Sequence, residues 1–217
     1  MRAIETILFD ADGVLQRPQT RWRLAFAALP TLVEDGLLDQ FTRDILVVEA
    51  AFLECEDDFA AAVYELVSRV GHGLDTAAIL AILNAIEVDA AIMNVVQSIR
   101  SLGTKCYLTT NQQVHRARHM SEALNYAGLF DGEFYSCRMG VAKPKPGYFE
   151  HVLAALKQPA ESILFLDDRS ENVAAAIQVG MRAEVFDGVA GASALLDLLA
   201  KHGVRPVSPP TSEWVRS

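Results

Sequence analysis

Residues 4–15 have the sequence Ile-Glu-Thr-Ile-Leu-Phe-Asp-Ala-Asp-Gly-Val-Leu, in which an apolar run ends abruptly in acidic and small residues. A short, continuously apolar run that stops at a polar loop is typical of a buried parallel strand. We therefore expect a strand over residues 4–9, followed by a loop that carries Asp10, Asp12 and Gly13.

The same pattern, an apolar run followed by polar residues, recurs along the chain. The further candidate strands cover residues 106–108, 133–136, 162–166 and 181–186. Between them lie segments with a helical spacing of apolar residues, notably 89–102 and 172–179. Strands that alternate with helices predict an α/β fold with a doubly wound parallel sheet.

One long stretch, over residues 16–87, interrupts this alternation. It contains no convincing strand, and its apolar spacing predicts several amphipathic helices. The expected helices cover residues 22–29, 33–52, 58–70 and 76–86. We therefore expect a core made of residues 1–15 and 88–203, a helical insertion over 16–87, and an extended tail over 204–217.

The composition excludes several classes of protein. The chain has 217 residues, of which 51% are hydrophobic and 22% are charged, and its formal net charge is -9. This apolar fraction is too high for a disordered chain, and the glycines and prolines show no collagen-like period. Because an acidic surface repels phosphate backbones, we expect neither nucleic acid nor an anionic membrane as a partner. The composition leaves the oligomeric state open.

The cysteines and the N-terminus bear on localisation. The three cysteines are odd in number and widely spaced, which indicates reduced thiols and a cytoplasmic protein. The N-terminus lacks the apolar stretch and the cleavage site of a signal peptide. Polar residues interrupt every long apolar stretch, so the sequence predicts no membrane span.

Reactive side chains follow three of the predicted strands. They are Asp10 and Asp12, Thr110 and Asn111, and Asp167 and Asp168. The carboxyl ends of parallel strands share one edge of a sheet, and carboxylates that converge there repel one another unless a cation such as Mg²⁺ joins them. One carboxylate can attack phosphorus and form an acyl phosphate, while a second transfers protons. The alternative for each position alone is a helix cap or a turn.

Four short motifs resemble those of the haloacid dehalogenase-like hydrolase superfamily, in the same order. They are residues 7–15, residues 108–111, Lys143 within 140–146, and residues 165–168 with Asn172 and Gly180. The resemblance implies a Rossmann-like core with an inserted α-helical cap after the first motif. This expectation agrees with the insertion that the hydrophobic pattern predicts.

The resemblance also implies roles for the acidic residues. Asp10 is expected to be the nucleophile and a Mg²⁺ ligand. Asp12 is expected to be the general acid and base, and to bind the metal through its backbone carbonyl. Asp168 is expected to complete the metal site with Asp167 beside it, and which of these two binds directly is open.

Further roles concern the phosphoryl group. By the same resemblance, Thr110 and the backbone amides around Asn111 and Gly13 hold it. Lys143 pairs with its oxygens and with the nucleophile, which offsets the charge that grows in the transition state.

These expectations point to a Mg²⁺-dependent phosphatase for a small phosphorylated metabolite, with sugar phosphates among the candidates. Dehalogenases of the superfamily lack the second acid of the first motif, whereas Asp12 is present here, and an alkoxide leaving group needs such an acid. The alternatives are a phosphosugar mutase of the same architecture and a non-catalytic binding protein. Arg17, Arg21 and Arg23 are expected either to meet a substrate anion or to form an exposed basic patch.

Overall fold

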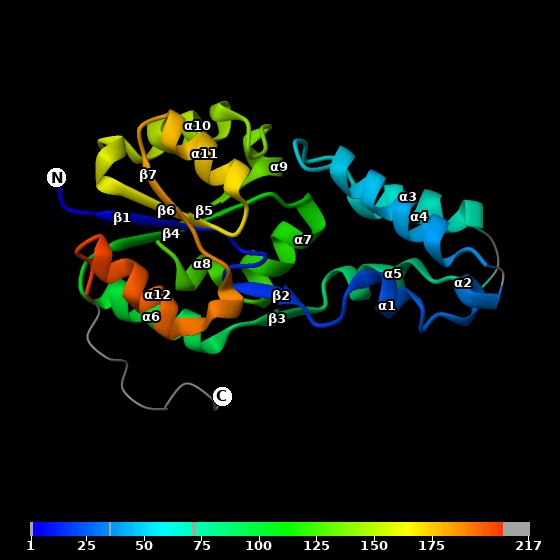
Figure 1. Cartoon of the computed structure of the whole chain (residues 1–217). Helices are drawn as coiled ribbons and strands as arrows, with labels where there is room; N and C mark the ends of the chain where they lie inside the picture. The colour runs from blue at the N-terminus through cyan, green and yellow to red at the C-terminus, as the bar shows by residue number, and fades with distance from the viewer. Residues whose placement is uncertain (1, 35, 71–72, 206–217) are drawn as a thin grey trace.

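A five-stranded parallel sheet is the centre of the fold in the computed structural model, which describes residues 2–34, 36–70 and 73–205 (Figure 1). Its strands are β1 (Thr6–Phe9), β4 (Lys105–Thr110), β5 (Gly132–Tyr135), β6 (Ile163–Asp167) and β7 (Arg182–Val185). They lie in the order β5-β4-β1-β6-β7, and every neighbouring pair is parallel. The predicted doubly wound sheet is confirmed, and a strand lies in each of the five predicted segments.

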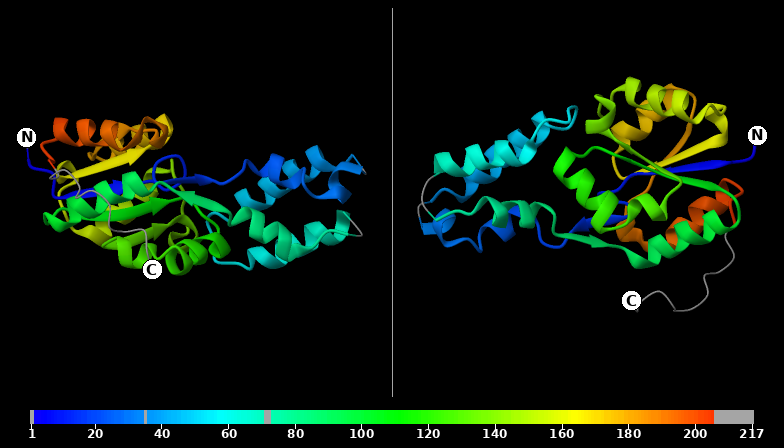
Figure 2. Two further views of the ribbon diagram at one scale, coloured as in Figure 1. Left: turned by 90° about the horizontal axis from the view of Figure 1, so that it is seen from below. Right: turned by 180° about the vertical axis from the view of Figure 1, so that it is seen from behind.

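Helices cover both faces of this sheet (Figures 1 and 2). The helices α6 (Ala90–Ser101) and α12 (Gly191–Lys201) pack on one face, and α10 (Pro146–Leu156) and α11 (Ser170–Gln178) pack on the other. Ile7 and Phe9 belong to the first core and Leu8 to the second, as the period of two in a strand requires. Both core helices predicted from their spacing are thereby confirmed as α6 and α11.

Shorter elements complete the larger unit. They are α7 (Val114–Arg118), the π-helix η1 (His119–Ala123), α8 (Tyr126–Leu129), α9 (Ser136–Met139), and the 3₁₀ turns η2 (Ala160–Ser162) and η3 (Gly188–Ala190). None of the helices in the described part of the chain has the length and hydrophobicity needed to cross a bilayer.

The inserted segment forms five helices with a hydrophobic core of their own. They are α1 (Trp22–Phe26), α2 (Pro30–Glu34), α3 (Leu38–Ala51), α4 (Phe59–Val70) and α5 (Thr76–Leu83). Phe26 and Phe41 meet edge to face in this core, with their ring centroids 5.2 Å apart. The helices extend outward from the sheet edge at which β1 ends (Figure 1). The residue boundaries of core and insertion given above stay predictions.

The expectation that residues 16–87 hold no strand is wrong. Two short strands, β2 (Gln16–Pro18) and β3 (Ile86–Val88), pair antiparallel where the chain enters and leaves the helical segment. Three residues are too few to reveal an alternation of period two, which explains why the sequence pattern missed them. The same pairing ends the predicted helix over 76–86 early, because Ile86 belongs to β3.

The single helix expected over residues 33–52 is also wrong, because the segment is divided between α2 and α3. Gly36 has a φ of +66°, and the Leu37 N–H donates to the Leu32 carbonyl at 2.9 Å. This left-handed glycine and the backward hydrogen bond are typical of a helix C-terminus. The predicted tail lies outside the described residues from position 206 onward.

Candidate active site

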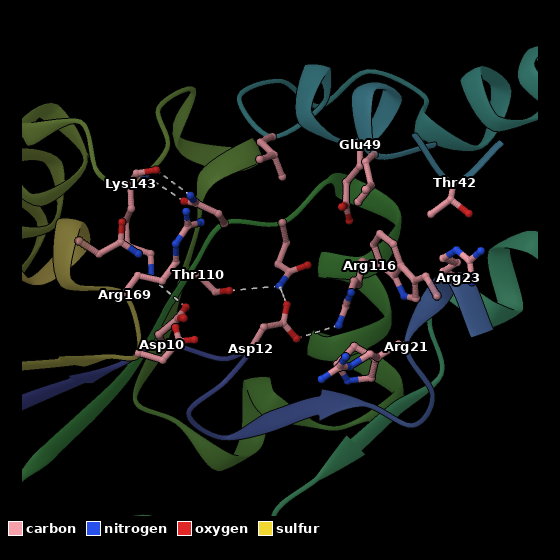
Figure 3. A pocket seen from close by; sticks show the side chains of 18 residues that line it. Asp10, Asp12, Arg21, Arg23, Thr42, Glu49, Thr110, Arg116, Lys143 and Arg169 are labelled. Carbon is pink, nitrogen blue, oxygen red and sulfur yellow. Dashed lines mark hydrogen bonds and ion pairs between the residues drawn. The ribbon is translucent and has the colours of Figure 1, made fainter. Parts of the chain in front are cut away.

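Three strands of the sheet end at one cleft, which lies between the sheet and the helices α1 and α3 (Figure 3). Asp10 follows β1, Thr110 ends β4, and Asp168 follows β6. These strands are parallel neighbours in the order β4-β1-β6, so their carboxyl ends meet at one edge. The cleft has a volume of about 570 Å³, a usual size for a small-molecule site.

Lys143 lies at the centre of the site and is almost completely buried. Its Nζ donates to Asp10 Oδ1 at 2.8 Å, to Asp167 Oδ2 at 2.6 Å and to the Thr109 carbonyl at 2.9 Å. Burial alone lowers the pKa of an ammonium group, but the two carboxylates outweigh it, so the pKa of Lys143 is raised. The lysine is therefore held as a cation between two aspartates.

Asp10 is buried directly beyond the end of β1. Its backbone N–H donates to the Leu166 carbonyl at 2.9 Å, which extends the pairing of β1 with β6 and fixes the start of the loop. Burial raises the pKa of Asp10 to about 7, although Lys143 opposes this shift and Asp167 adds to it. A carboxylate in this position is stabilised by any further cation that reaches it.

The residues present fit a divalent cation. Asp10, Asp167 and Asp168 each offer a carboxylate oxygen within 4.8 Å of the other two. Such hard oxygen donors suit Mg²⁺. Burial, together with the charge of Asp167, raises the pKa of Asp168 more than the nearby Lys143 and Arg169 lower it. The Asp12 side chain stands outside this carboxylate cluster.

The two aspartates after β6 differ in their surroundings. Asp167 is fully buried, and its oxygens accept hydrogen bonds from Lys143, from the Arg169 backbone N–H and from the Asn172 amide. Asp168 is exposed and lies against Gly13. Asp167 is therefore engaged inside the protein, whereas Asp168 faces the cleft.

Gly13 is a position that tolerates no side chain. Its φ is +91°, and a Cβ there would lie 2.4 Å from Asp168 Oδ2. We expect Gly13→Ala to displace Asp168 and to weaken Mg²⁺ binding about tenfold, measured by titration calorimetry.

Gly103→Ala is a matched control for this prediction. Gly103 has a φ of +94°, but nothing lies within 4 Å of its added Cβ. The control therefore carries the same backbone strain without touching the acidic cluster. An equal loss of Mg²⁺ affinity in both variants would contradict the assignment of the loss to Asp168.

The two polar residues at the end of β4 have different environments. Thr110 is buried, and its Oγ1 accepts a hydrogen bond from Gln112 Nε2 at 3.2 Å. The Asn111 amide faces the lysine loop, where Nδ2 donates to the Lys143 carbonyl at 2.8 Å and Oδ1 accepts from the Lys143 N–H at 2.9 Å. The side chain of Asn111 thus holds the backbone that carries Lys143.

The backbone amides of the first loop are only partly available. The Gly13 N–H donates to the Gln16 carbonyl at 2.8 Å, so this predicted phosphoryl donor is already engaged. The N–H groups of Ala11 and Asp12 donate to no acceptor within residues 2–34, 36–70 and 73–205. Sequence reasoning missed this difference, because it depends on which amides the turn to β2 consumes.

One face of the helical insertion forms the opposite wall of the cleft. Thr42, Leu46, Glu49 and Leu53 recur at intervals of four, three and four residues, which places them on one side of α3 and its continuation. Burial raises the pKa of Glu49 to about 7, while Arg116 lowers it and Asp12 raises it further. The spacing was visible in the sequence, but no motif marked it as a site.

The three arginines singled out from the sequence separate into two groups. Arg21 and Arg23 line the cleft beside Trp22 (Figure 3). Arg17 instead pairs with Glu87 at 3.1 Å across the β2–β3 ribbon, and its side chain is 57% exposed. Arg23 lines the cleft but is also paired, with Asp39 at 2.7 Å, and is 55% exposed. The exposed-patch interpretation therefore fits Arg17 and, in part, Arg23.

Glu54 connects the insertion to the lysine loop, a contact that sequence reasoning missed. Its Oε1 accepts from the Ala142 N–H at 2.8 Å, and both of its oxygens accept from Lys145 Nζ at 2.7 Å. The Lys145 ammonium and the Ala142 amide lower the pKa of this carboxyl. Glu54 thus contacts the chain on both sides of Lys143.

Comparisons with known proteins agree with this geometry. The family model for haloacid dehalogenase-like hydrolases matches residues 4–180. The sesquiterpene phosphatase astK of Aspergillus oryzae is 29% identical over 178 residues, which are 80% of this chain and 85% of that protein. Bifunctional epoxide hydrolase 2 of Sus scrofa is 26% identical, and the match covers 97% of this chain but 41% of that protein.

Solved structures share the fold. A HAD family enzyme from Bacteroides thetaiotaomicron, in complex with magnesium and inorganic phosphate, superposes with a TM-score of 0.71 at 19% identity, covering 89% of this chain and 99% of that one. A HAD phosphatase from Thermococcus onnurineus gives a TM-score of 0.67 at 17% identity, covering 94% and 100%.

Proposed function

Since the chain belongs to the haloacid dehalogenase-like hydrolase family, we propose that it is a Mg²⁺-dependent phosphatase of small phosphorylated metabolites that reacts through an aspartyl phosphate on Asp10. One observation carries the proposal: two aspartates on the same loop have different surroundings. Asp10 accepts a hydrogen bond from Lys143 and belongs to the acidic cluster, whereas the Asp12 side chain lies outside that cluster. A nucleophile and a separate proton-transferring group are what hydrolysis of a phosphate monoester requires.

The reaction proceeds in two displacements. A carboxylate oxygen of Asp10 forms a bond to phosphorus while the bond from phosphorus to the alcohol oxygen breaks, and Asp12 gives that oxygen a proton. Asp12 then takes a proton from water, whose oxygen attacks phosphorus and releases inorganic phosphate and the Asp10 carboxylate. Thr110 and the unpaired N–H groups of the first loop bind the phosphoryl oxygens. Lys143 joins them by turning toward the phosphoryl group one of its three N–H groups, all of which donate to Asp10, Asp167 and the Thr109 carbonyl in this structure.

Asp10 and Asp168 would hold Mg²⁺, together with the Asp12 carbonyl. When bound, the cation neutralises charge on the phosphoryl group and on Asp10. Asp167 acts mainly as an anchor, because its oxygens already accept from Lys143, Arg169 and Asn172.

Helices α1–α5 act as a cap that excludes water and selects the alcohol. Trp22, Leu46 and Leu53 give the wall opposite the phosphoryl site an apolar part, next to the polar Thr42 and Glu49. This wall favours alcohols with a hydrocarbon part over sugars, and the likeness to a sesquiterpene phosphatase supports the same choice.

Phosphate release from a panel of esters tests the function. The panel contains phosphate monoesters of straight-chain alcohols, a sugar phosphate and 4-nitrophenyl phosphate, each with Mg²⁺ and with chelator. We expect release only with Mg²⁺, and kcat/KM that rises with alkyl chain length. Folded protein that releases no phosphate from any ester would contradict the phosphatase proposal, and conversion of one sugar phosphate isomer into another would establish the mutase alternative.

Asp12→Asn tests the proton-transfer role. The amide cannot donate a carboxylic proton, so kcat for an alkyl phosphate should fall about 100-fold or more. The loss should be much smaller for 4-nitrophenyl phosphate, because nitrophenolate leaves without protonation. Equal losses for both esters would overturn the role assigned to Asp12.

A further inference from the structure

The Asp12 carboxylate is oriented by three donors from two segments of the chain, Gln16 in the first and Gln112 with Arg116 in the second. Arg116 Nη2 and Gln16 Nε2 donate to Oδ1 at 2.8 Å and 2.9 Å, and Gln112 Nε2 donates to Oδ2 at 2.7 Å. The Asp12 side chain is 38% exposed, so packing alone does not fix its rotamer. The donors therefore decide where its oxygens point, and Figure 3 shows the ion pair of Asp12 with one of them, Arg116.

Arg116 is the charged member of this set and is itself buried. Its side chain is 4% exposed, and the guanidinium carbon lies 5.8 Å from the centre of the Trp22 ring. Gln113 caps α7 by accepting from the Arg116 N–H at 3.0 Å, which fixes the base of the side chain. Arg116 Nε has no acceptor in the described part of the chain.

An ion pair between a buried guanidinium and a partly exposed carboxylate is a weak means of stabilising a fold. Desolvation of the guanidinium offsets most of its attraction to Asp12 and to the nearby Glu49 carboxylate, and an apolar pair of similar volume is often as stable. Because the pair of Arg116 and Asp12 contributes little to stability and lines the cleft, we look for its role in the reaction.

We propose that Arg116 is a positioning residue that acts on the reaction through Asp12. The inference rests on the proposed phosphatase function, in which Asp12 exchanges protons with the alcohol oxygen and with water. Proton transfer requires the carboxyl oxygen within hydrogen-bond reach of the reacting atom, and small errors of orientation reduce rates strongly. Asp10 is oriented separately, by Lys143.

Two of the residues that orient Asp12, Gln112 and Arg116, follow the phosphoryl-binding Thr110 closely in the chain. Thr110 ends β4, and Arg116 lies in α7, the first helix after it. Gln112 between them donates to both Thr110 Oγ1 and Asp12 Oδ2. One short segment therefore sets the position of the phosphoryl-binding hydroxyl and of the proton-transferring carboxyl together.

The test compares Arg116→Gln, Asp12→Asn and the double variant on an alkyl phosphate and on 4-nitrophenyl phosphate. For Arg116→Gln we expect kcat on the alkyl ester to fall about 30-fold with KM changed less than about threefold, and kcat on the aryl ester to fall less than about threefold. In the double variant, kcat on the alkyl ester should be less than about threefold below that of Asp12→Asn alone. Arg116 acts through the Asp12 carboxylate, which Asp12→Asn has already removed. Arg116→Lys should recover part of the loss, since it restores the charge.

Arg100→Gln is the control for a merely structural arginine. Arg100 is 24% exposed and pairs with Asp131 at 3.1 Å, away from the cleft. Its loss should lower thermal stability without changing the ratio of alkyl to aryl rates.

Two results would count against the proposal in different ways. Equal losses on both esters for Arg116→Gln, or losses that multiply with those of Asp12→Asn, would overturn the positioning role and leave the phosphatase function intact. If Asp12→Asn itself shows no dependence on the leaving group, the proton-transfer role of Asp12 fails, and the inference about Arg116 fails with it.

Discussion

Replacing Asp10 with asparagine is expected to abolish turnover, with kcat at least about 1,000-fold below that of the wild type and with the fold retained. The amide is nearly isosteric with the carboxylate, and its oxygen can still accept the hydrogen bond that Lys143 Nζ now makes at 2.8 Å. It is nevertheless a poor nucleophile toward phosphorus. Phosphate release from the best ester of the panel measures the loss, and circular dichroism verifies the fold.

The same variant has a second readout, which is the pH dependence of stability in chelator. Burial raises the pKa of Asp10 to about 7 in the folded protein, from 3.8 as the usual value. The folded state therefore binds this proton more tightly than the unfolded state, and the group's contribution to stability is lost as the pH rises through about 7. The amide of the Asp10→Asn variant has no such proton, so this loss is absent from the variant. Between about pH 4 and pH 8, the unfolding free energy of the variant should therefore rise relative to that of the wild type.

Asp75→Asn is the matched control for Asp10→Asn. Asp75 caps α5 by accepting from the Ala77 N–H, and asparagine caps a helix equally well. The control should keep wild-type turnover. Substantial residual activity in Asp10→Asn, with intact mass confirming that the amide has not reverted, would contradict the aspartyl-phosphate mechanism.

The fold could be predicted from the sequence wherever a segment is long enough to show a period. The apolar runs before Asp10, Thr110 and Asp167 each become a strand of the parallel sheet. The β2–β3 ribbon and the break at Gly36 could not be predicted in this way. Each depends on a few residues whose partners are set by tertiary pairing or by one left-handed backbone conformation.

The residues of the candidate site also fall into those that could be predicted from the sequence and those that could not. Residues that end a strand could be placed from the sequence, since topology alone brings them to one edge. The contacts of Arg116 with Asp12 and of Glu54 with Lys145 could not, because each joins segments that no shared motif connects. The engaged amide of Gly13 belongs to the same group, since its acceptor is the Gln16 carbonyl at the start of the unforeseen ribbon.

Lys143→Gln is expected to have the other large effect, and it affects activity and stability together. The variant leaves Asp10 and Asp167 buried without the ammonium that now lies 2.8 Å and 2.6 Å from their oxygens. Removal of one partner from a buried ion pair costs about 3–5 kcal/mol. We expect a loss of this size in the free energy of unfolding, measured by urea denaturation in chelator, and a fall in kcat of at least about 100-fold with Mg²⁺ present.

Saturating Mg²⁺ separates the two effects, because the proposed cation site shares Asp10 with the ion pairs that Lys143→Gln removes. Added Mg²⁺ should restore part of the lost stability but not the rate, since a metal at Asp10 and Asp168 does not replace the N–H donors of Lys143. Lys145→Gln is the matched control: its side chain is 62% exposed and pairs with Glu54, so both stability and kcat should change little. Full recovery of kcat by Mg²⁺ in Lys143→Gln would show that the lysine serves only to neutralise the buried aspartates, and would remove it from the phosphoryl-binding role.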